Sequence, residues 1–291
     1  MTMSTYSIVA DSGSTKTDWA IIDADSKIVE KVRTKGFNPY FHSVDFIQNE
    51  VSKVFNEVGV ASHDIGSVHY YGAGCSSGEK KSIVEIALGS QFGNATINVH
   101  HDLVGAARAS LGHENGIACI IGTGSNSCVW ENGHVLDNIP SHGYVFGDEG
   151  SGAHLGIELV KMYLQNNLNG EIRTAFEKRY DLTSNEILNA TYKKKDPNVF
   201  LAQFAAFYED HLEVEQLRNI VLQCFRDFFR TRILPYECEY KNLGFVGSIS
   251  SHYEQILVEV AKEHGYEVSN ISKCPIDKLV SYHAEAFKLT G

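Results

Sequence analysis

The sequence VADSGSTKTDW at residues 9–19 is matched without a gap by IIGTGSNSCVW at residues 120–130. Each copy begins with two apolar residues, continues through small and hydroxyl-bearing residues, and ends on one of the chain's two tryptophans, Trp19 or Trp130. Two further positions are identical, Gly13 with Gly124 and Ser14 with Ser125. Internal similarity of this kind indicates a repeated architecture. We therefore predict two related halves, each with a hairpin at this place.

The turns of both hairpins have the composition of a phosphate site. Gly13 and Gly124 permit close backbone approach and positive φ, so the amides of Ser14, Thr15, Ser125 and Asn126 can point into one anion-binding concavity. An ordinary hairpin usually has one Asn-Gly or Asp-Gly turn and needs fewer hydroxyls. The predicted phosphate-binding residues are Gly13, Ser14, Thr15 and Lys16 in the first turn, and Gly122, Thr123, Gly124 and Ser125 in the second.

The first turn is not a P-loop. Thr15 precedes Lys16 where that motif has glycine, and no G-x-G-x-x-G sequence follows a strand. Lys16 is therefore not assigned the role of a P-loop lysine, and a solvated side chain is the alternative to phosphate contact.

Hydrophobic periodicity predicts alternating strands and helices. Strands are predicted at residues 6–11, 18–23, 27–34, 68–71, 95–99, 117–121 and 243–246. Helices are predicted from the N-cap Ser43 to Gly59, at 79–92, at 103–111 and over a long region at 152–234, and two more helices follow the last strand. This mixture belongs to the α/β class.

Composition limits the partners. A chain of 291 residues with 43% hydrophobic content is large enough for two domains. Its formal net charge of -11 argues against a nucleic-acid partner, and no stretch is long and apolar enough for a membrane span, so we expect a cytoplasmic protein. Six cysteines without a C-x-x-C pair indicate neither zinc nor a disulfide framework.

Three motifs together resemble the N-acetylglucosamine kinase group: DSGSTKT at 11–17, GTGSNS at 122–127 and GDEGSG at 147–152. That group belongs to the benzoyl-CoA reductase ATPase branch of the actin, hexokinase and Hsp70 superfamily. The resemblance implies an α/β, duplicated actin-like (ribonuclease H-like) ATPase fold with two lobes and a central cleft. It places the lobes at residues 1–114, with a returning helix at 277–291, and at residues 115–276.

The resemblance also implies roles for two aspartates. Asp11, at the end of the first strand, would hold Mg²⁺ through water, although a turn-forming aspartate is the local alternative. Asp102, in HHDLVGAARA, would be the catalytic base and would contact the sugar hydroxyl, whereas an isolated aspartate there most often caps a helix.

The remaining site residues follow from the same resemblance. Asn38 in GFNPYF, Gly74 and Cys75 in GAGCS, Thr123, and Asp148 in GDEGSG would bind the sugar, with helix capping as the local alternative for Asp148. Gly247 and Ser248 in GFVGSIS would bind adenosine. Phe37, Pro39 and Cys75 do not match an N-acetyl pocket, so the identity of the sugar stays open.

The function implied is an ATP- and Mg²⁺-dependent kinase that phosphorylates a hydroxyl of an amino sugar, N-acetylglucosamine or a close relative. A homodimer is left open. The alternative is an ATPase that activates a partner redox enzyme. Such activators bind an iron–sulfur cluster between subunits through cysteines, and Cys119 and Cys128 flank the second hairpin.

Overall fold

The computed structural model describes residues 6–13 and 15–290, the last five of them for the backbone alone. Its contacts divide the chain into two compact units. Unit 1 comprises residues 1–114, 132–135 and 274–291, and unit 2 comprises residues 115–131 and 136–273. We propose that these units correspond to the two lobes expected from the sequence, and each is described here by itself.

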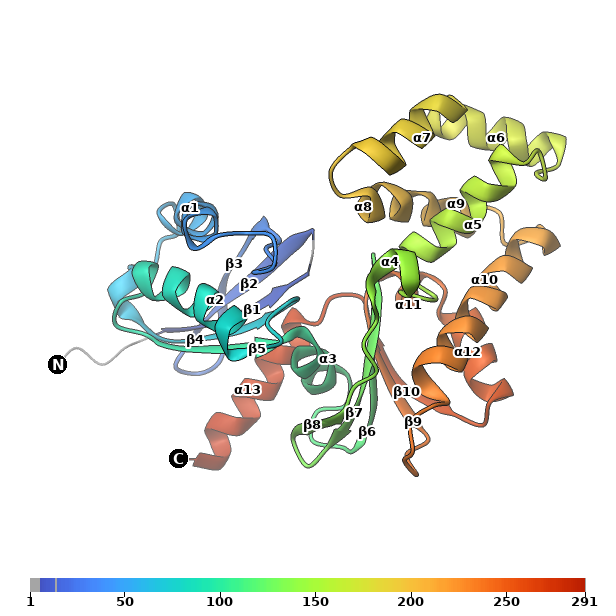
Figure 1. The fold of residues 1–291 in the computed structure, drawn as a ribbon. Coiled ribbons are helices and arrows are strands. Elements are labelled where there is room, and N and C mark those ends of the chain that lie inside the picture. The colour runs from blue at the N-terminus through green and yellow to red at the C-terminus, as the bar shows by residue number, and fades with distance from the viewer. Residues whose placement is uncertain (1–5, 14, 291) are drawn as a thin grey trace. The chain divides into compact units, whose positions relative to one another are not determined.

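Unit 1 is built on a five-stranded sheet of order β3-β2-β1-β4-β5 (Figure 1). The strands are β1 (Tyr6–Ser12), β2 (Lys16–Asp23), β3 (Ile28–Lys35), β4 (Ile65–Gly72) and β5 (Thr96–His101). The first three strands pair antiparallel, whereas β4 and β5 run parallel to β1. The carboxyl ends of β1, β4 and β5 therefore lie at one edge of the sheet.

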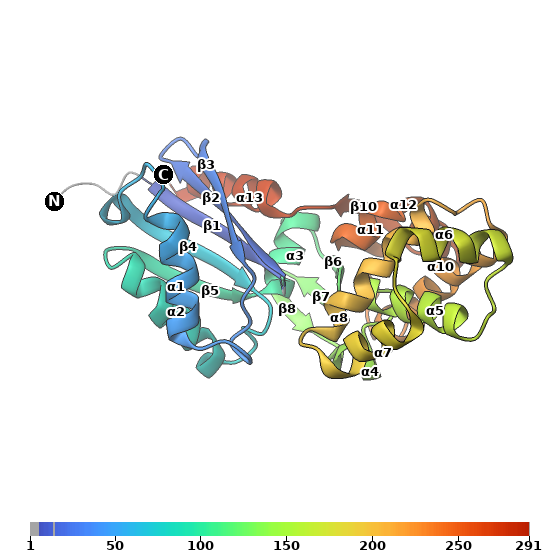
Figure 2. The same cartoon turned by 90° about the horizontal axis from the view of Figure 1, so that it is seen from above.

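Helices cover both faces of this sheet (Figures 1 and 2). On one face lie α1 (Val44–Phe55) and α2 (Gly78–Gln91), and on the other lie α3 (Asp102–Ser110) and α13 (Ile276–Thr290). The predicted cap is confirmed, since Ser43 accepts the Phe46 N–H at 3.3 Å. Apolar residues of α1 and α2, such as Val51 and Leu88, are fully buried against the strands.

The second sheet has the order β10-β9-β6-β7-β8 and, except for the start of β8, lies in unit 2. Its strands are β6 (Gly116–Ile121), β7 (Ser125–Glu131), β8 (His134–Asp137), β9 (Asn242–Val246) and β10 (Glu267–Ser272). The helices are α4 (Gly143–Phe146), α5 (Gly152–Leu164), α6 (Gly170–Tyr180), α7 (Ser184–Lys193), α8 (Pro197–Ala202), α9 (Ala206–Glu209), α10 (Glu215–Phe228), α11 (Ser248–His252) and α12 (Glu254–Glu263). Three short elements complete the description: Ser62–Asp64, Gln203–Ala205 and the π-helix Phe229–Ile233.

The two sheets share one topology, which confirms the duplicated α/β fold. In each, an antiparallel meander of three strands is extended by two parallel strands beside its first strand. The hairpin registers differ, however. Trp19 pairs with Ala10, whereas Trp130 pairs with Gly116, five positions before Ile121, the residue that aligns with Ala10. The gapless sequence match therefore locates the two hairpins correctly but does not give equivalent ladder positions.

Two strands, β8 and β10, were not expected from the sequence. Strand β10 (Glu267–Ser272) follows α12 and pairs parallel with β9 at the edge of its sheet. Its sequence EVSNIS is mostly polar, and only Val268 and Ile271 pack against the core. An edge strand of this kind has a weak hydrophobic pattern. Within the described part of the chain, no helix has the length and apolar character needed to cross a membrane.

Candidate functional site

The carboxyl edge of the first sheet gathers most of the unit 1 residues predicted to be functional. Strand β1 ends at Ser12, β4 at Gly72 and β5 at His101, and the three strands are parallel neighbours. Asp11 is the second-last residue of β1, just before this edge. Asp102 is the first residue of α3, directly after β5. Open α/β sheets bind their ligands outside the carboxyl ends of their strands.

Asp11 and Asp102 lie close enough for their charges to interact. The pKa of Asp11 is raised to about 7, first by burial and then by the negative charges of Asp102 and Asp18. Lys16 acts in the opposite direction. This edge of the sheet therefore concentrates carboxylates and would favour a bound cation.

Asp102 has an oxygen available for a ligand. Its Oδ1 is buried and lies 2.9 Å from His101 Nδ1, which can donate a hydrogen bond to it only when that nitrogen carries a proton. The same nitrogen faces the Leu103 N–H at 3.3 Å and caps α3 when it is unprotonated. Burial lowers the pKa of His101, but the hydrogen bond and charge of Asp102 outweigh burial and raise it. An unprotonated Nδ1 thus caps α3 and leaves the Asp102 carboxylate for other partners, whereas a protonated Nδ1 pairs with Asp102 instead.

The predicted sugar loops of unit 1 are in direct contact. Gly74 has φ +78°, and a Cβ there would lie 2.2 Å from Asn38 Oδ1. That oxygen accepts the Tyr40 N–H at 2.9 Å. Separately, Asn38 Nδ2 makes no hydrogen bond among the described residues. Cys75 is fully buried, and burial followed by the charge of Asp102 raises the pKa of its thiol to about 12. The structure therefore brings Asn38, Gly74, Cys75 and Asp102 to the same part of unit 1.

The first predicted phosphate turn is exposed at Gly13, Thr15 and Lys16, while Ser14 lies outside the described residues. The Gly13 N–H donates to Lys16 O at 3.0 Å, and Gly13 does not adopt positive φ. Lys16 Nζ pairs with Asp18 Oδ2 at 2.6 Å, and Arg33 Nε binds the other oxygen of Asp18 at 2.6 Å. Lys16 is therefore partnered by a carboxylate in the absence of any ligand.

The second turn uses several of its backbone groups internally. The Gly122 N–H donates to Gly124 O at 2.9 Å, and the Gly122 and Thr123 carbonyls accept the first amides of α5, at 2.8 and 3.1 Å. The Ser125 N–H donates to Asp148 Oδ1 at 3.2 Å. Positive φ at Gly124, expected from the sequence, does not occur. Among the described residues, the Thr123 and Gly124 N–H groups remain the unpaired backbone donors of this turn.

The predicted adenosine residues lie beside the second turn, within unit 2. A Cβ on Gly247 would lie 2.2 Å from Ile121 O and 3.2 Å from Gly122 N. Any larger residue at position 247 would therefore displace the backbone of the turn. Ser248 begins α11 and is exposed. The structure brings Gly247 together with Gly122, which are separated by more than a hundred residues in sequence.

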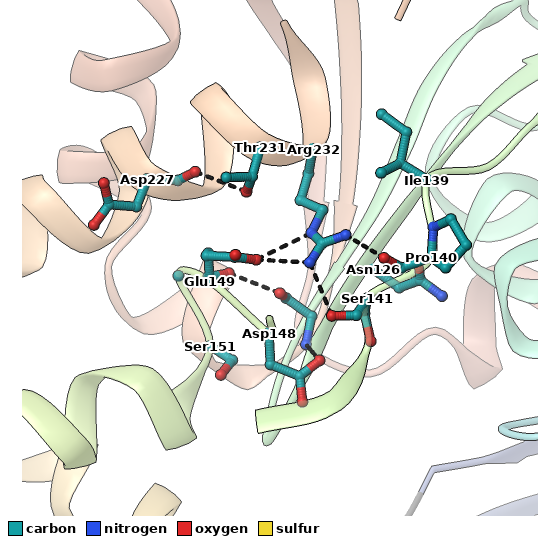
Figure 3. Close-up of polar contacts among 12 residues, drawn as sticks. Asn126, Ile139, Pro140, Ser141, Asp148, Glu149, Ser151, Asp227, Thr231 and Arg232 are labelled. Atoms are coloured by element: carbon teal, nitrogen blue, oxygen red, sulfur yellow. Dashed lines mark hydrogen bonds and ion pairs between the residues drawn. The ribbon is translucent and has the colours of Figure 1, made fainter. Parts of the chain in front are cut away.

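The GDEGSG segment is also packed on the second turn. Figure 3 shows its residues Asp148, Glu149 and Ser151. Asp148 lies against Gly124, whose Cβ would meet Asp148 Oδ2 at 2.9 Å. Burial raises the pKa of Asp148, and the hydrogen bonds from Ser125 and Ser141 and the charge of Arg232 limit that rise. Glu149 points the other way and forms an ion pair with Arg232 at 2.8 Å. Of the two acidic residues, only Asp148 contacts the turn through its side chain.

Comparison with known proteins identifies the family. Residues 10–207 match the model of the BadF/BadG/BcrA/BcrD ATPase family. The chain belongs to the BadF/BadG/BcrA/BcrD ATPase family. A crystal structure from Porphyromonas gingivalis, titled "Putative N-acetylglucosamine Kinase", is 35% identical with a TM-score of 0.90, covering 96% of this chain and 99% of that one. The family resemblance drawn from the sequence motifs is thereby confirmed.

More distant structures share the fold of this BadF/BadG/BcrA/BcrD family member. A Chromobacterium violaceum structure, also titled "Putative N-acetylglucosamine Kinase", is 14% identical with a TM-score of 0.70, covering 96% of this chain and 98% of that one. A ROK family glucokinase from Streptomyces griseus, in complex with glucose and AMPPNP, is 15% identical with a TM-score of 0.61. That likeness covers 98% of this chain and 100% of that one. No curated protein sequence gives a significant match.

Sequence reasoning missed Tyr70 at the carboxyl edge of the first sheet in this family member. Its side chain is fully buried, its ring lies over Gly72, and its hydroxyl has no hydrogen-bond partner among the described residues. Burial and then the charge of Cys75 raise the pKa of Tyr70, a weak hydrogen-bonding contact with Ser12 lowers it, and the charges of Asp11 and Asp102 raise it further. In the sequence Tyr70 was indistinguishable from a core residue of a predicted strand.

Proposed function

We propose that this protein is an ATP-dependent kinase that phosphorylates a hydroxyl of an amino sugar, N-acetylglucosamine or a close relative. The observation that carries the proposal is the buried Oδ1 of Asp102, which accepts no hydrogen bond when His101 caps α3 and lies beside the Asn38, Gly74 and Cys75 segment. A buried acceptor without a donor is costly unless a ligand supplies one, and a sugar hydroxyl is such a donor. The kinase title of the 35% identical Porphyromonas structure supports the same class of substrate.

In the proposed reaction, a sugar hydroxyl donates its hydrogen bond to the Asp102 carboxylate. The hydroxyl oxygen forms a bond to the γ-phosphorus of ATP while the bond from that phosphorus to the β,γ-bridging oxygen breaks, and ADP leaves. The proton passes to Asp102. Asn38 Nδ2, unpaired among the described residues, would donate a hydrogen bond that fixes the sugar.

The nucleotide would be held by the residues predicted for it. The Thr123 and Gly124 N–H groups are available for phosphate oxygens, and Gly247 and Ser248 lie next to that turn for the adenosine. Asp11 fits Mg²⁺ bound through water, because a cation beside it would offset the burial and the repulsion from Asp102 and Asp18 that raise its pKa. When bound, Mg²⁺ would neutralise charge on the phosphates.

The alternative activator function is less well supported. Cys119 and Cys128, the residues that would have to reach a cluster between subunits, are fully buried in the core of unit 2. Burial raises the pKa of the Cys119 thiol well above its usual value, which disfavours the thiolate that a cluster needs.

A substrate panel tests the proposal. Release of ADP is measured with Mg²⁺ and ATP, without sugar and with N-acetylglucosamine, glucosamine, N-acetylmuramate or glucose, and the products are examined by mass spectrometry for an added phosphoryl group. We expect an amino sugar to accelerate ADP release strongly over the reaction without sugar. Hydrolysis of ATP at a rate indifferent to every sugar, together with a brown anaerobically purified protein, would instead support the activator.

A further inference from the structure

Arg232 is a buried cation in the π-helix Phe229–Ile233, and sequence analysis gave it no role. Its side chain is 4% exposed, so its charge must be compensated within the protein. The neighbouring Arg230 points outward instead, is 72% exposed and pairs with Asp227 at 2.9 Å. The two arginines of one helical turn thus have different environments.

The acceptors of Arg232 lie where loop 141–150 begins, at Pro140 and Ser141, and near its end, at Glu149 (Figure 3). On the incoming side, Nη2 donates to Ser141 O at 2.9 Å and Nη1 donates to Pro140 O. On the outgoing side, Nε and Nη2 donate to Glu149 Oε2 at 3.1 and 2.8 Å. At the base of the loop, the guanidinium therefore connects the segment that enters the loop with the segment that leaves it.

The loop ends are packed as closely as a backbone permits. A Cβ on Gly147 would lie 1.6 Å from Ser141 O and 2.6 Å from Arg232 Nη2. The incoming segment is fixed a second time, since Asn138 Nδ2 donates to Ser127 O at 2.6 Å. In contrast, Val145 and Phe146 at the tip of the loop are 62% and 81% exposed.

The outgoing end of the loop connects this base to the second turn. Asp148 Oδ1 accepts the Ser125 N–H, and Glu149 O accepts the Ser125 hydroxyl at 2.7 Å. Asp148 and Glu149 are adjacent, so a movement of Glu149 away from Arg232 would also move Asp148 away from Ser125. The charge of Arg232 additionally opposes the effect of burial on the pKa of Asp148.

We propose that Arg232 is a positioning residue that holds the base of loop 141–150, so that Asp148 is presented to the sugar beside the second turn. This inference rests on the proposed function for its catalytic consequence, but the positioning itself is a property of the unliganded protein. Arg232 touches neither substrate in this proposal.

The test compares Arg232→Met, Arg232→Lys, the double variant Arg232→Met/Glu149→Met and the control Arg230→Met. Removing Arg232 alone leaves Glu149 without its cation and is expected to destabilise the protein, whereas removing both partners relieves that cost. We therefore expect the double variant to fold, with the base of loop 141–150 no longer held by Arg232. Lysine cannot reach acceptors on both sides with one ammonium group, so we expect Arg232→Lys to rescue only partly.

Two readouts separate positioning from general stability. In amide hydrogen exchange of the unliganded proteins, we expect faster exchange confined to residues 141–150 in the double variant and none in Arg230→Met. In steady-state kinetics, we expect the KM for the amino sugar to rise by at least about tenfold, with the KM for ATP changed less than about threefold.

Unchanged exchange at 141–150 in the double variant would overturn the inference, as would equal increases in both KM values. A wild-type protein that phosphorylates no sugar would refute the proposed function instead. Faster amide exchange of loop 141–150 in the double variant would, in that case, still support the positioning role of Arg232.

Discussion

Gly74 is packed directly on Asn38, with no room between the Gly74 backbone and the Asn38 side-chain oxygen for a methyl group. The position that a Cβ would take lies 2.2 Å from Asn38 Oδ1 and 2.7 Å from its Cγ. Gly74 also has φ +78°, which L side chains adopt only at a cost of about 1–2 kcal/mol. The two loops predicted to bind sugar are thus in direct contact, and the position of each constrains the other.

The substitution Gly74→Ala should therefore displace Asn38. We expect the KM for the amino sugar to rise by about tenfold or more and the free energy of unfolding to fall by ~1–2 kcal/mol. Gly78→Ala is a matched control in the same segment, because nothing lies within 4 Å of its Cβ position and it begins α2. Equal sugar KM values in Gly74→Ala and wild type would show that this contact does not shape the sugar site.

The substitution Asp102→Asn should remove the base while keeping the shape of the side chain. We expect turnover to fall by about 10²–10⁴ with nearly unchanged ATP affinity, measured by ADP release and by nucleotide titration. Asp25→Asn, at an aspartate that is 77% exposed, serves as the control. Full turnover in Asp102→Asn would refute the assignment.

The substitution Tyr70→Phe should separate stability from activity. Because the buried hydroxyl has no partner among the described residues, its removal should leave the thermal midpoint unchanged or raise it. We expect sugar-dependent turnover to fall by roughly tenfold, since the hydroxyl lies among Asp11, Cys75 and Asp102.

The adjacent Tyr71→Phe is the informative comparison for Tyr70→Phe. Its hydroxyl accepts from Arg108 at 2.6 Å and lies 2.8 Å from His283 Nε2. Loss of these bonds should destabilise unit 1 by ~1–2 kcal/mol. If Tyr70→Phe were the more destabilising of the two variants, the reading of its hydroxyl as unpartnered would be wrong.

A group of buried and half-buried histidines should make unit 1 sensitive to acid. Burial, followed by the charge of Arg108, lowers the pKa values of His69 and His100 to about 4, and burial followed by His69 and Arg108 lowers that of His283 to about 3. In the unfolded chain these imidazoles titrate near 6.5. Their folded pKa values lie below this, so the stabilisation is complete above pH 6.5 and is lost as pH falls toward 4.

We expect the free energy of unfolding, measured by urea at pH 7.5 and pH 5, to decrease by roughly 1–2 kcal/mol for each of these histidines. His283→Gln keeps a group able to hydrogen-bond Tyr71 but removes one titration, so its loss between the two pH values should be smaller. A wild-type stability that does not change between pH 7.5 and 5 would contradict the expectation.

The parts of the fold that could be predicted from the sequence are those that depend on residues close together in the chain. The Gly- and Ser-rich turns, the Ser43 cap and the alternation of strands and helices depend on neighbouring residues, and the structure has each of them. The ladder register of the hairpins was not accessible, because it depends on how many residues each turn takes. The first turn leaves residues 13–16 between paired strands, and the second leaves only 122–124.

The roles of residues in the candidate site were even harder to predict from the sequence than the hairpin register. Arg232 is 83 positions from Glu149, and nothing in its surrounding sequence distinguishes it from the exposed Arg230. Tyr70 has the sequence context of a core strand residue, and its unpartnered hydroxyl is visible only when Asp11, Cys75 and Asp102 are brought around it. Contacts between distant segments, rather than residue types, decide these roles.

The path of the chain also sets an order for its synthesis. Helix α13 packs on β1, β2 and α3, yet it is translated after all of unit 2. At about 5–20 residues per second, residues 115–273 take roughly 8–30 s to emerge from the ribosome. The nascent first sheet must wait that long with one face covered by α3 alone, so the second half of this protein has its complete set of helices before the first.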